Sequence, residues 1–376
     1  MAYTEKYLNY DLDSGDNDGS SEANAWQTFA DAISGASPGD RVNVKRTSSR
    51  ISTGDIQWNK SGTVDAPIHI RAYETTIGDG GMFEMNNRFR CSGTDVITEG
   101  IDIVSNTTLL LWMTGNRNVA YRCRVEYTNS SGSCCIVRAL TGVLINCYVK
   151  SSVGSGYVVN LYQSAAIGCY FEATDVATTS SGARMVEMEN SYRYSNVVNC
   201  IFKGNGDADL KGINVINDQN GRGGLIQNNV FEGMGTCITY NEGGFGQSIA
   251  VIQDNIFYNA TKAIENLRGT NSSSKWGYFI NNNATGLLTG AAYTNVGDYI
   301  PNQIVLTESP FIDTTHYELN DAPGGGALCK FRGTAPDPSV PSIKGPTFAS
   351  NRDSGRVNFT SIGGTIPKGA ESSHVF

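Results

Sequence analysis

The sequence predicts an all-β fold: a single-stranded parallel β-helix with a short N-terminal capping helix and an extended C-terminal tail. Two observations favour this solenoid. A phrase that alternates apolar and polar residues returns six times, with a seventh degenerate copy, and such alternation is typical of β-strands. A second strand-like segment falls once in each interval, and the Gly, Asn, Ser, Thr and Asp residues between the strands favour turns.

The phrase begins as Val119-Ala-Tyr-Arg-Cys-Arg-Val-Glu126 and ends, in its degenerate copy, as Tyr278-Phe-Ile-Asn-Asn-Asn283. When its fifth letter is used as an anchor, consecutive anchors lie 24, 22, 31, 29, 26 and 27 residues apart, which is the period of solenoids. Because successive coils stack about 4.8 Å apart, equivalent residues should form one interior column. The anchors are Cys123, Cys147, Cys169, Cys200, Asn229, Asn255 and approximately Asn282.

We expect the four cysteines of this column to be buried, reduced thiols. The three asparagines should form an amide ladder in which each side chain donates to the next. A metal site or disulfides are the alternative, but the spacing is far from the paired cysteines of zinc sites. The chain has nine cysteines, an odd number, so we predict no metal and synthesis in a reducing cytosol.

The chain divides into an N-terminal loop and capping helix (residues 1–40), the β-helix (41–306) and a closing segment with a Pro-rich tail (307–376). Helical spacing between Ser21 and Ile33 places Trp26 and Phe29 on one apolar face. Such a helix is expected to cover the open end of the first coil.

The acidic loop before this helix has a second interpretation. Asp16 and Asp18 partly match the spacing of a calcium loop, but the closing Glu of such a loop is missing. Calcium at this loop is therefore kept as an alternative to a plain turn, and no other cofactor is expected.

Several stretches resemble right-handed parallel β-helix proteins of the pectate-lyase-like superfamily. They are Asp13-Ser-Gly-Asp-Asn-Asp-Gly-Ser-Ser21 with Trp26 and Ser37-Pro-Gly-Asp-Arg-Val42, then Asn228-Asn-Val-Phe-Glu-Gly233, and Ser309-Pro-Phe-Ile-Asp313 followed by Tyr317-Glu-Leu-Asn320. The resemblance covers roughly Asp11 to Cys329 and implies a right-handed solenoid. It implies less about function, because the superfamily includes polysaccharide lyases, glycoside hydrolases, epimerases, bacteriophage tailspikes and other virion proteins.

Charge and hydropathy exclude some partners. The net charge of −8 and the pI near 5.0 argue against nucleic acid and anionic membrane surfaces. No stretch is apolar enough to span a bilayer. The N-terminus does not have the basic and then apolar character of a secretory signal, so we expect a protein made in the cytoplasm of its host cell.

Outward positions of the second strand series form a polar face. Glu187, Glu189 and Asp218 are the candidate catalytic carboxylates, because paired carboxylates perform glycoside hydrolysis. A lyase would instead need a basic group, and Arg184, Arg193 and Lys211 are nearby. Any solvated sheet face carries such residues, however, and no aspartate pair typical of galacturonases recurs. The candidate glycan-binding residues are Asn160, Tyr162, Asn214, Asn241, Glu242 and Glu265.

We therefore predict a non-enzymatic structural component of a bacteriophage particle, such as a capsid decoration, tail or spike protein located in the virion. We expect it to contact host-surface glycans through the β-helix face. The alternative is a polysaccharide lyase or glycoside hydrolase that uses the carboxylates of that face. The Pro-rich stretch from Ala335 to Pro346 is expected to lie along other virion proteins or further copies of the chain, for instance in a trimer.

Overall fold

The computed structural model describes most of the chain up to Lys330. The described residues are 3–52, 54–129, 137–153, 156–176, 182–189, 195–218, 224–243, 250–266, 278–296, 300, 302–314 and 317–330. They fall into two compact units, one up to Lys150 and one from Ser151 onward. The predicted tail contact with a partner, beyond Lys330, lies outside the described residues.

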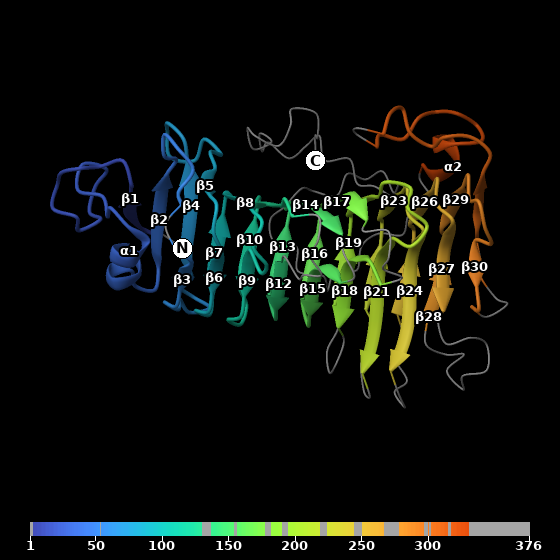
Figure 1. The fold of residues 1–376 in the computed structure, drawn as a ribbon, viewed down its shortest axis with the longest axis horizontal. Coiled ribbons are helices and arrows are strands. Elements are labelled where there is room, and N and C mark those ends of the chain that lie inside the picture. The colour runs from blue at the N-terminus through green and yellow to red at the C-terminus, as the bar shows by residue number, and fades with distance from the viewer. Residues whose placement is uncertain are drawn as a thin grey trace. The chain divides into compact units, whose positions relative to one another are not determined.

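In the first unit, strands from successive coils pair in parallel to form three sheets (Figure 1). Sheet A contains β1 (Thr4–Leu8), β2 (Asp40–Lys45), β4 (Ile68–Tyr73), β7 (Val96–Glu99), β10 (Val119–Tyr121) and β13 (Val143–Ile145). Sheet B contains β5 (Phe83–Met85), β8 (Ile101–Ser105), β11 (Arg124–Tyr127) and β14 (Tyr148–Val153). Sheet C contains β3 (Ile56–Trp58), β6 (Phe89–Cys91), β9 (Leu111–Met113) and β12 (Val137–Leu140).

The second unit repeats the same three-sheet arrangement. Its sheet A strands are β16 (Ala165–Ile167), β19 (Asn196–Val198), β22 (Leu225–Gln227), β25 (Ala250–Gln253) and β28 (Tyr278–Asn281). Its sheet B strands are β17 (Tyr170–Val176), β20 (Ile201–Lys203), β23 (Val230–Glu232), β26 (Ile256–Tyr258), β29 (Ala284–Gly286) and β31 (Ile304–Leu306). Its sheet C strands are β15 (Tyr157–Tyr162), β18 (Arg184–Glu189), β21 (Lys211–Asp218), β24 (Thr236–Gly243), β27 (Lys262–Asn266) and β30 (Tyr293–Thr294).

This architecture confirms the predicted fold class, an all-β right-handed parallel β-solenoid with very little helix. The interior is built from columns of like side chains. In the second unit Phe171, Phe202, Phe231 and Phe257 align in register on sheet B. Their ring centroids lie 5.0, 4.6 and 5.3 Å apart, and such aromatic pairs contribute about 0.5–1.5 kcal/mol each beyond their buried area.

The anchor residues occupy one structural position in each coil, directly after sheet A. The Nδ2 atoms of Asn229 and Asn255 each donate, at 3.0 Å, to the carbonyl of the middle residue of the preceding sheet A strand. The thiols of Cys147 and Cys200 do the same, at 3.4 and 3.5 Å. Cysteine in the earlier coils and asparagine in the later ones can fill the same position because both present a donor to that carbonyl and an acceptor to a backbone N–H.

One predicted member of the column is wrong. Asn283, not Asn282, continues the ladder: its Oδ1 accepts from the backbone N of Asn255 at 2.9 Å. Asn282 takes the position before it, where the backbone turns between sheets A and B with a left-handed φ of 51°. Asn228 and Asp254 hold the same turn position with φ of 56° and 59°, which suits residues that tolerate the left-handed region.

The N-terminal segment also differs from the prediction. Its helix α1 (Phe29–Gly35) begins later than expected, after an N-cap at Thr28 whose side chain accepts from the Asp31 backbone N. Trp26 is buried but precedes the helix, and it packs over Gly19, where a β-carbon would lie 2.6 Å from the indole ring. Residues 4–8 form a strand of sheet A that the sequence analysis assigned to a loop.

The acidic loop is closed by its own hydrogen bonds. The Asp18 carboxylate accepts from the Ser20 backbone N at 2.8 Å, and the Asn17 side chain accepts from the Gln27 backbone N at 2.8 Å. The described residues contain no group of three His, Cys, Asp or Glu side chains arranged to hold a metal ion. Calcium binding at Asp16 and Asp18 stays a prediction.

The closing segment packs on sheet B of the second unit. Phe311 and Leu319 form an antiparallel bridge, and the buried Tyr317 donates from its hydroxyl to Glu232. Helix α2 (Gly326–Cys329) follows. No helix among the described residues has the length and apolar character needed to cross a bilayer.

Candidate functional site

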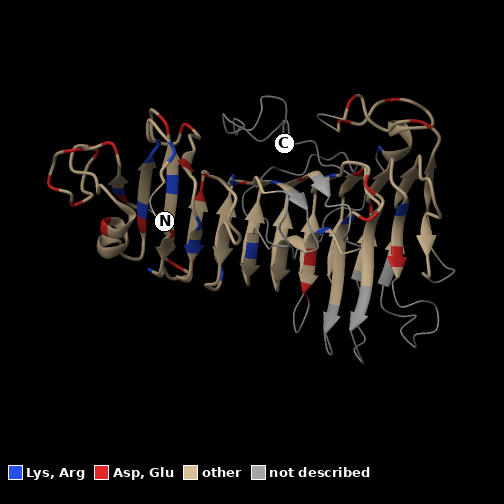
Figure 2. Cartoon of the chain, viewed as in Figure 1, with Lys and Arg blue, Asp and Glu red and all other residues tan. Residues whose placement is uncertain are grey.

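The outer face of sheet C in the second unit carries a polar row that crosses five strands. Asn160 aligns with Glu187, which aligns with Asn214 on the next strand. Thr239 and Glu265 continue the row on β24 and β27. Figure 2 shows the acidic residues of β18 and β27 in red. The parallel register therefore brings four of the predicted site residues, Asn160, Glu187, Asn214 and Glu265, into one line.

A second row runs parallel to the first, three residues earlier on each strand. It contains Tyr157, Arg184, Lys211, Thr236 and Lys262, aligned in register. Arg184 and Lys211 were predicted as nearby bases, whereas Tyr157, Thr236 and Lys262 were not predicted. The available signal was the recurrence of a basic or polar residue three positions before each outward polar residue of the second strand series.

Ion pairs neutralise two carboxylates of this face. Arg184 Nε lies 2.7 Å from Glu187 Oε2, and Lys262 Nζ lies 2.6 Å from Glu265 Oε1. Glu187 is only 5% exposed, and burial raises its pKa although the charge of Arg184 opposes the shift. A buried, paired carboxylate of this kind is not free to attack or protonate an external glycosidic bond.

Burial also decides which predicted glycan contacts are reachable. Asn160 and Asn214 are buried, and Thr239 Oγ1 donates to Asn214 Oδ1 at 2.8 Å. Asn160 Nδ2 donates to Glu189 Oε2 at 3.2 Å, and Glu189 and Tyr162 are partly exposed. A ligand on this face would therefore meet Tyr162, Glu189 and the basic row rather than the two amides.

The remaining predicted residues lie at the ends of β21 and β24, and their side chains are outside the described part of the structure. The backbone register pairs Glu189 with Ile216, which pairs with Asn241, and pairs Asn217 with Glu242. Asp218 lies two residues beyond Ile216. Its backbone is therefore offset from that of Glu189 by about 8 Å, given the strand rise and the strand spacing.

Lys211 is the basic residue of this face with a shifted pKa. It is partly exposed and aligned with Arg184 on the neighbouring strand. Burial lowers its pKa first, and the charge of Arg184 lowers it further. A lysine whose pKa is lowered is closer to the state in which it can accept a proton at neutral pH.

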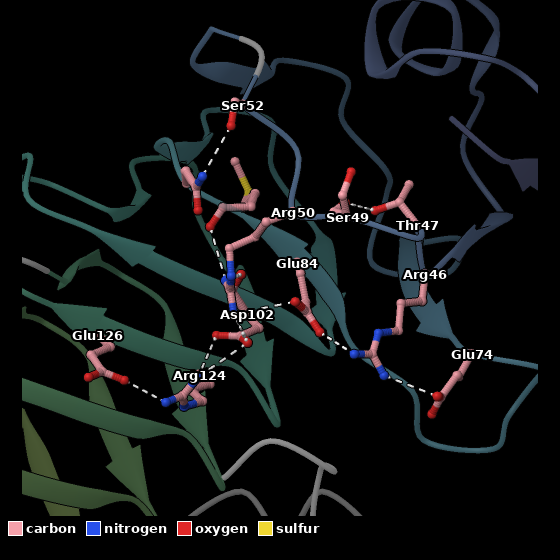
Figure 3. A network of polar contacts seen from close by, with 12 residues as sticks. Arg46, Thr47, Ser49, Arg50, Ser52, Glu74, Glu84, Asp102, Arg124 and Glu126 are labelled. Atoms are coloured by element: carbon pink, nitrogen blue, oxygen red, sulfur yellow. Dashed lines mark hydrogen bonds and ion pairs between the residues drawn. The ribbon is translucent and has the colours of Figure 1, made fainter. Parts of the chain in front are cut away.

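The first unit contains a dense polar network across sheet B (Figure 3). Arg46 bridges Glu74 and Glu84, at 3.0 and 2.6 Å. Asp102 is only 5% exposed and receives Arg50 at 2.7 Å and Arg124 at 3.3 Å. Every arginine labelled in this network is paired with at least one carboxylate, so each of these positive charges is compensated.

His69 lies on sheet A of the first unit with both ring nitrogens occupied. Its Nε2 lies 2.8 Å from Glu99 Oε2, and Arg41 Nε donates to its Nδ1 at 3.2 Å. Burial raises the pKa of Glu99, but the hydrogen bond and charge of His69, with Arg122 and Arg71, lower it overall. The imidazole therefore has no free lone pair for a metal ion.

No protein-family model matches the chain, and no curated protein matches it. Solved structures do. The pectate lyase Pel9A has 15% sequence identity and a TM-score of 0.57, covering 83% of this chain and 84% of its own. A rhamnogalacturonan lyase has 13% identity and a TM-score of 0.47, covering 82% and 91%. The PL6 family polysaccharide lyase Pedsa3628 from Pseudopedobacter saltans has 13% identity and a TM-score of 0.44, covering 75% and 82%.

The likeness to Pel9A shows a shared fold. The chain is therefore a parallel β-solenoid structurally similar to pectate-lyase-like β-helix proteins, as the sequence motifs predicted. The outer face of sheet C is its candidate functional site.

Proposed function

We propose that this protein is a non-catalytic β-solenoid that binds a polysaccharide along the outer face of sheet C. The observation that carries the proposal is the second row, in which Tyr157, Arg184, Lys211 and Lys262 are partly exposed and aligned in register across the coils. The coil repeat is about 4.8 Å, close to the advance of one sugar ring along a glycan chain. A linear polymer therefore meets a matching series of contacts.

The state of the carboxylates favours binding over hydrolysis. Glu187 and Glu265 are each ion-paired with a basic residue three positions earlier, at 2.7 and 2.6 Å, and Glu187 is buried. Hydrolysis requires two accessible carboxyl groups on opposite sides of the scissile bond. A polysaccharide as ligand also agrees with the shared fold of a protein named as a pectate lyase.

The experiment is affinity electrophoresis and titration calorimetry with polygalacturonate, alginate, dextran sulfate and neutral dextran. We expect at least one polymer to bind without release of reducing ends or unsaturated products. Lys211→Gln should weaken binding several-fold, since an exposed charge contact contributes about 1 kcal/mol or less. Lys203→Gln, a matched charge change on sheet B, should not. Absence of binding to every polymer, or cleavage of any of them, would overturn the proposal.

We also propose, as part of the same function, that the protein is a component of a bacteriophage particle. A non-catalytic, glycan-binding solenoid is suited to a decoration, tail or spike protein that contacts a host surface. Mass spectrometry of purified particles, together with the identity of the genes that flank this one, tests that placement. The placement would be contradicted if the protein were detected only in cell extracts and if the genes that flank its own encoded metabolic enzymes.

The second candidate is polysaccharide lysis by β-elimination, favoured by the lowered pKa of Lys211. In that reaction the neutral Lys211 amine takes the proton next to the uronate carboxyl, and a carbon–carbon double bond forms in the ring that lost the proton. The bond to the leaving sugar oxygen breaks, and that oxygen takes a proton from solvent to become a hydroxyl group. Ultraviolet absorbance of the unsaturated product detects it directly. This candidate requires Lys211→Ala to abolish product formation, and it fails if the wild-type protein forms none.

A further inference from the structure

The first unit carries a separate row on the outer face of its sheet C. Arg90 aligns with Trp112, and Trp112 aligns with Arg138, on β6, β9 and β12. Each of these residues is partly exposed and lies between two buried residues of its own strand. Strand alternation therefore points all three side chains outward, away from the core.

Trp112 and Arg90 pack against each other. The guanidinium carbon of Arg90 lies 4.1 Å from the centroid of the Trp112 ring. Stacking on an aromatic face fixes the plane of a guanidinium while leaving its edge available to hydrogen-bond acceptors. Arg90 is thus held in one orientation on the surface without being neutralised.

Within the described part of the chain, no carboxylate compensates the charges of this row. Among the described residues neither Arg90 nor Arg138 forms an ion pair, and the Nε atoms of both arginines and Nε1 of Trp112 are buried without a hydrogen-bond partner. The contrast with the sheet B network in Figure 3 is direct, because Arg46, Arg50 and Arg124 all meet carboxylates there. In a chain of net charge −8, two arginines that flank a tryptophan and meet no carboxylate among the described residues are suited to contact an external anion.

We infer that Arg90, Trp112 and Arg138 form a binding site for an acidic glycan, one that carries carboxylate or sulfate groups. Arg90 and Arg138 are two coils apart, about 10 Å, which corresponds to acid groups on alternate sugar rings. Their guanidinium groups bind oxyanions through paired N–H donors, and the Trp112 ring between them packs against the intervening sugar. The site lies in the first unit and is independent of the second-unit residues that carry the proposed function.

The net negative charge of the whole chain favours an acidic glycan over a nucleic acid as the ligand of this site. Proteins that bind nucleic acid neutralise many phosphates and usually carry a positive net charge on the binding domain. Two arginines in a chain of net charge −8 fit a local contact with spaced acid groups. Single-stranded DNA is therefore included in the test as a competing ligand.

The test uses the full chain and its variants Arg90→Gln, Arg138→Gln and the double variant, titrated with polygalacturonate, dextran sulfate, neutral dextran and single-stranded DNA. Arg88→Gln is the matched control, because Arg88 lies two residues from Arg90 but outside the row, 3.6 Å from Asp55. Each single variant should weaken binding of an acidic polymer about tenfold, which is about 1.4 kcal/mol. Arg90→Lys should recover only part of the loss, since lysine keeps the charge but not the planar fork.

Comparison of polygalacturonate with dextran sulfate shows whether the site prefers carboxylate or sulfate groups. A thermal unfolding transition equal to that of the wild-type protein shows that a variant is folded. Weakening by Arg90→Gln and Arg138→Gln but not by Arg88→Gln, for either acidic polymer, supports the site. Equal effects of all three substitutions, tighter binding of single-stranded DNA, or an equal loss of neutral-dextran binding in the Arg90 and Arg138 variants would overturn it. If Lys211→Gln weakens polymer binding while the Arg90 and Arg138 variants do not, this inference fails and the proposed function stands.

Discussion

Asn255 is the position at which the interior column can be tested most sharply. Its Oδ1 accepts from the backbone N and from Nδ2 of Asn229, both at 3.0 Å. Its Nδ2 donates to the Ile226 carbonyl and to Asn283 Oδ1, again both at 3.0 Å. Asn255→Ala removes all four hydrogen bonds inside a buried column.

The loss of unfolding free energy can be estimated from the polar groups that lose a hydrogen-bond partner when Asn255 is replaced. Asn283 Oδ1 keeps the backbone N of Asn255, at 2.9 Å, and Asn229 Nδ2 keeps the Val197 carbonyl, at 3.0 Å. The backbone N–H of Asn229 and one of its amide hydrogens lose their acceptor. Each orphaned buried group costs about 1–3 kcal/mol, so Asn255→Ala should lower the free energy of unfolding by about 2–6 kcal/mol.

Asn255→Cys is the matched variant, because cysteine holds this position in earlier coils. There the Cys200 thiol accepts from the Cys169 backbone N at 3.4 Å and donates to the Ala166 carbonyl at 3.5 Å. Cysteine at position 255 should restore weaker versions of both contacts and limit the loss to about 1–2 kcal/mol. Urea denaturation followed by circular dichroism measures the losses, and hydrogen exchange reports the Asn229 amide directly.

A loss below about 1 kcal/mol for Asn255→Ala, far under the cost of two orphaned buried donors, would refute this reasoning. So would a fully protected Asn229 amide in that variant, or an Asn255→Cys variant less stable than Asn255→Ala. Any of these results would mean that the amide ladder is not what satisfies the backbone at this corner of the coil.

Three further predictions concern the core, the pH dependence and the thiols. Phe231→Ala, in the middle of the phenylalanine column, should destabilise the protein by about 3–5 kcal/mol in the same denaturation assay, and a loss near zero would show that the column does not pack as described. Because the pKa of Glu99 is lowered from its ordinary 4.5, its contribution to stability is present above that pH and is lost as the pH falls through the lowered value. Glu99→Gln should therefore flatten the acid side of the stability profile, and an unchanged profile would contradict the His69–Glu99 contact. Burial raises the pKa of Cys91 to about 12, so Cys91 should react with thiol reagents only after unfolding; rapid labelling of the native protein would exclude a buried thiol.

Much of the solenoid was predictable because each coil from Val119 to Asn283 contains a recognisable copy of the same sequence phrase. Alternating residues fixed the strands of both series, and the anchors Cys200, Asn229 and Asn255 fixed the register between coils. The one-residue error at Asn282 arose because the degenerate copy has asparagine at three consecutive positions. Only the backbone conformation separates the left-handed turn residue from the ladder residue beside it.

The site was less predictable, because alternation gives the direction of a side chain but not what covers it. Glu187 and Asn160 point outward from sheet C, as expected for their positions, yet both are buried. The row formed by Arg90, Trp112 and Arg138 was missed for a different reason. Its residues lie in early coils or in the first interval, where the anchor phrase is absent or only beginning, so the sequence offered no register by which to align them.

The most direct measurement is an experimental structure of the protein with a bound acidic oligosaccharide of six sugars. We expect an intact sugar chain that runs along the outer face of sheet C in the second unit, advances about one ring per coil and contacts Lys211 and Lys262. Acid groups within hydrogen-bond distance of Arg90 and Arg138 would in addition support the first-unit site. A cleaved product in the complex, or a sugar bound on sheet A or sheet B instead, would contradict the proposed function.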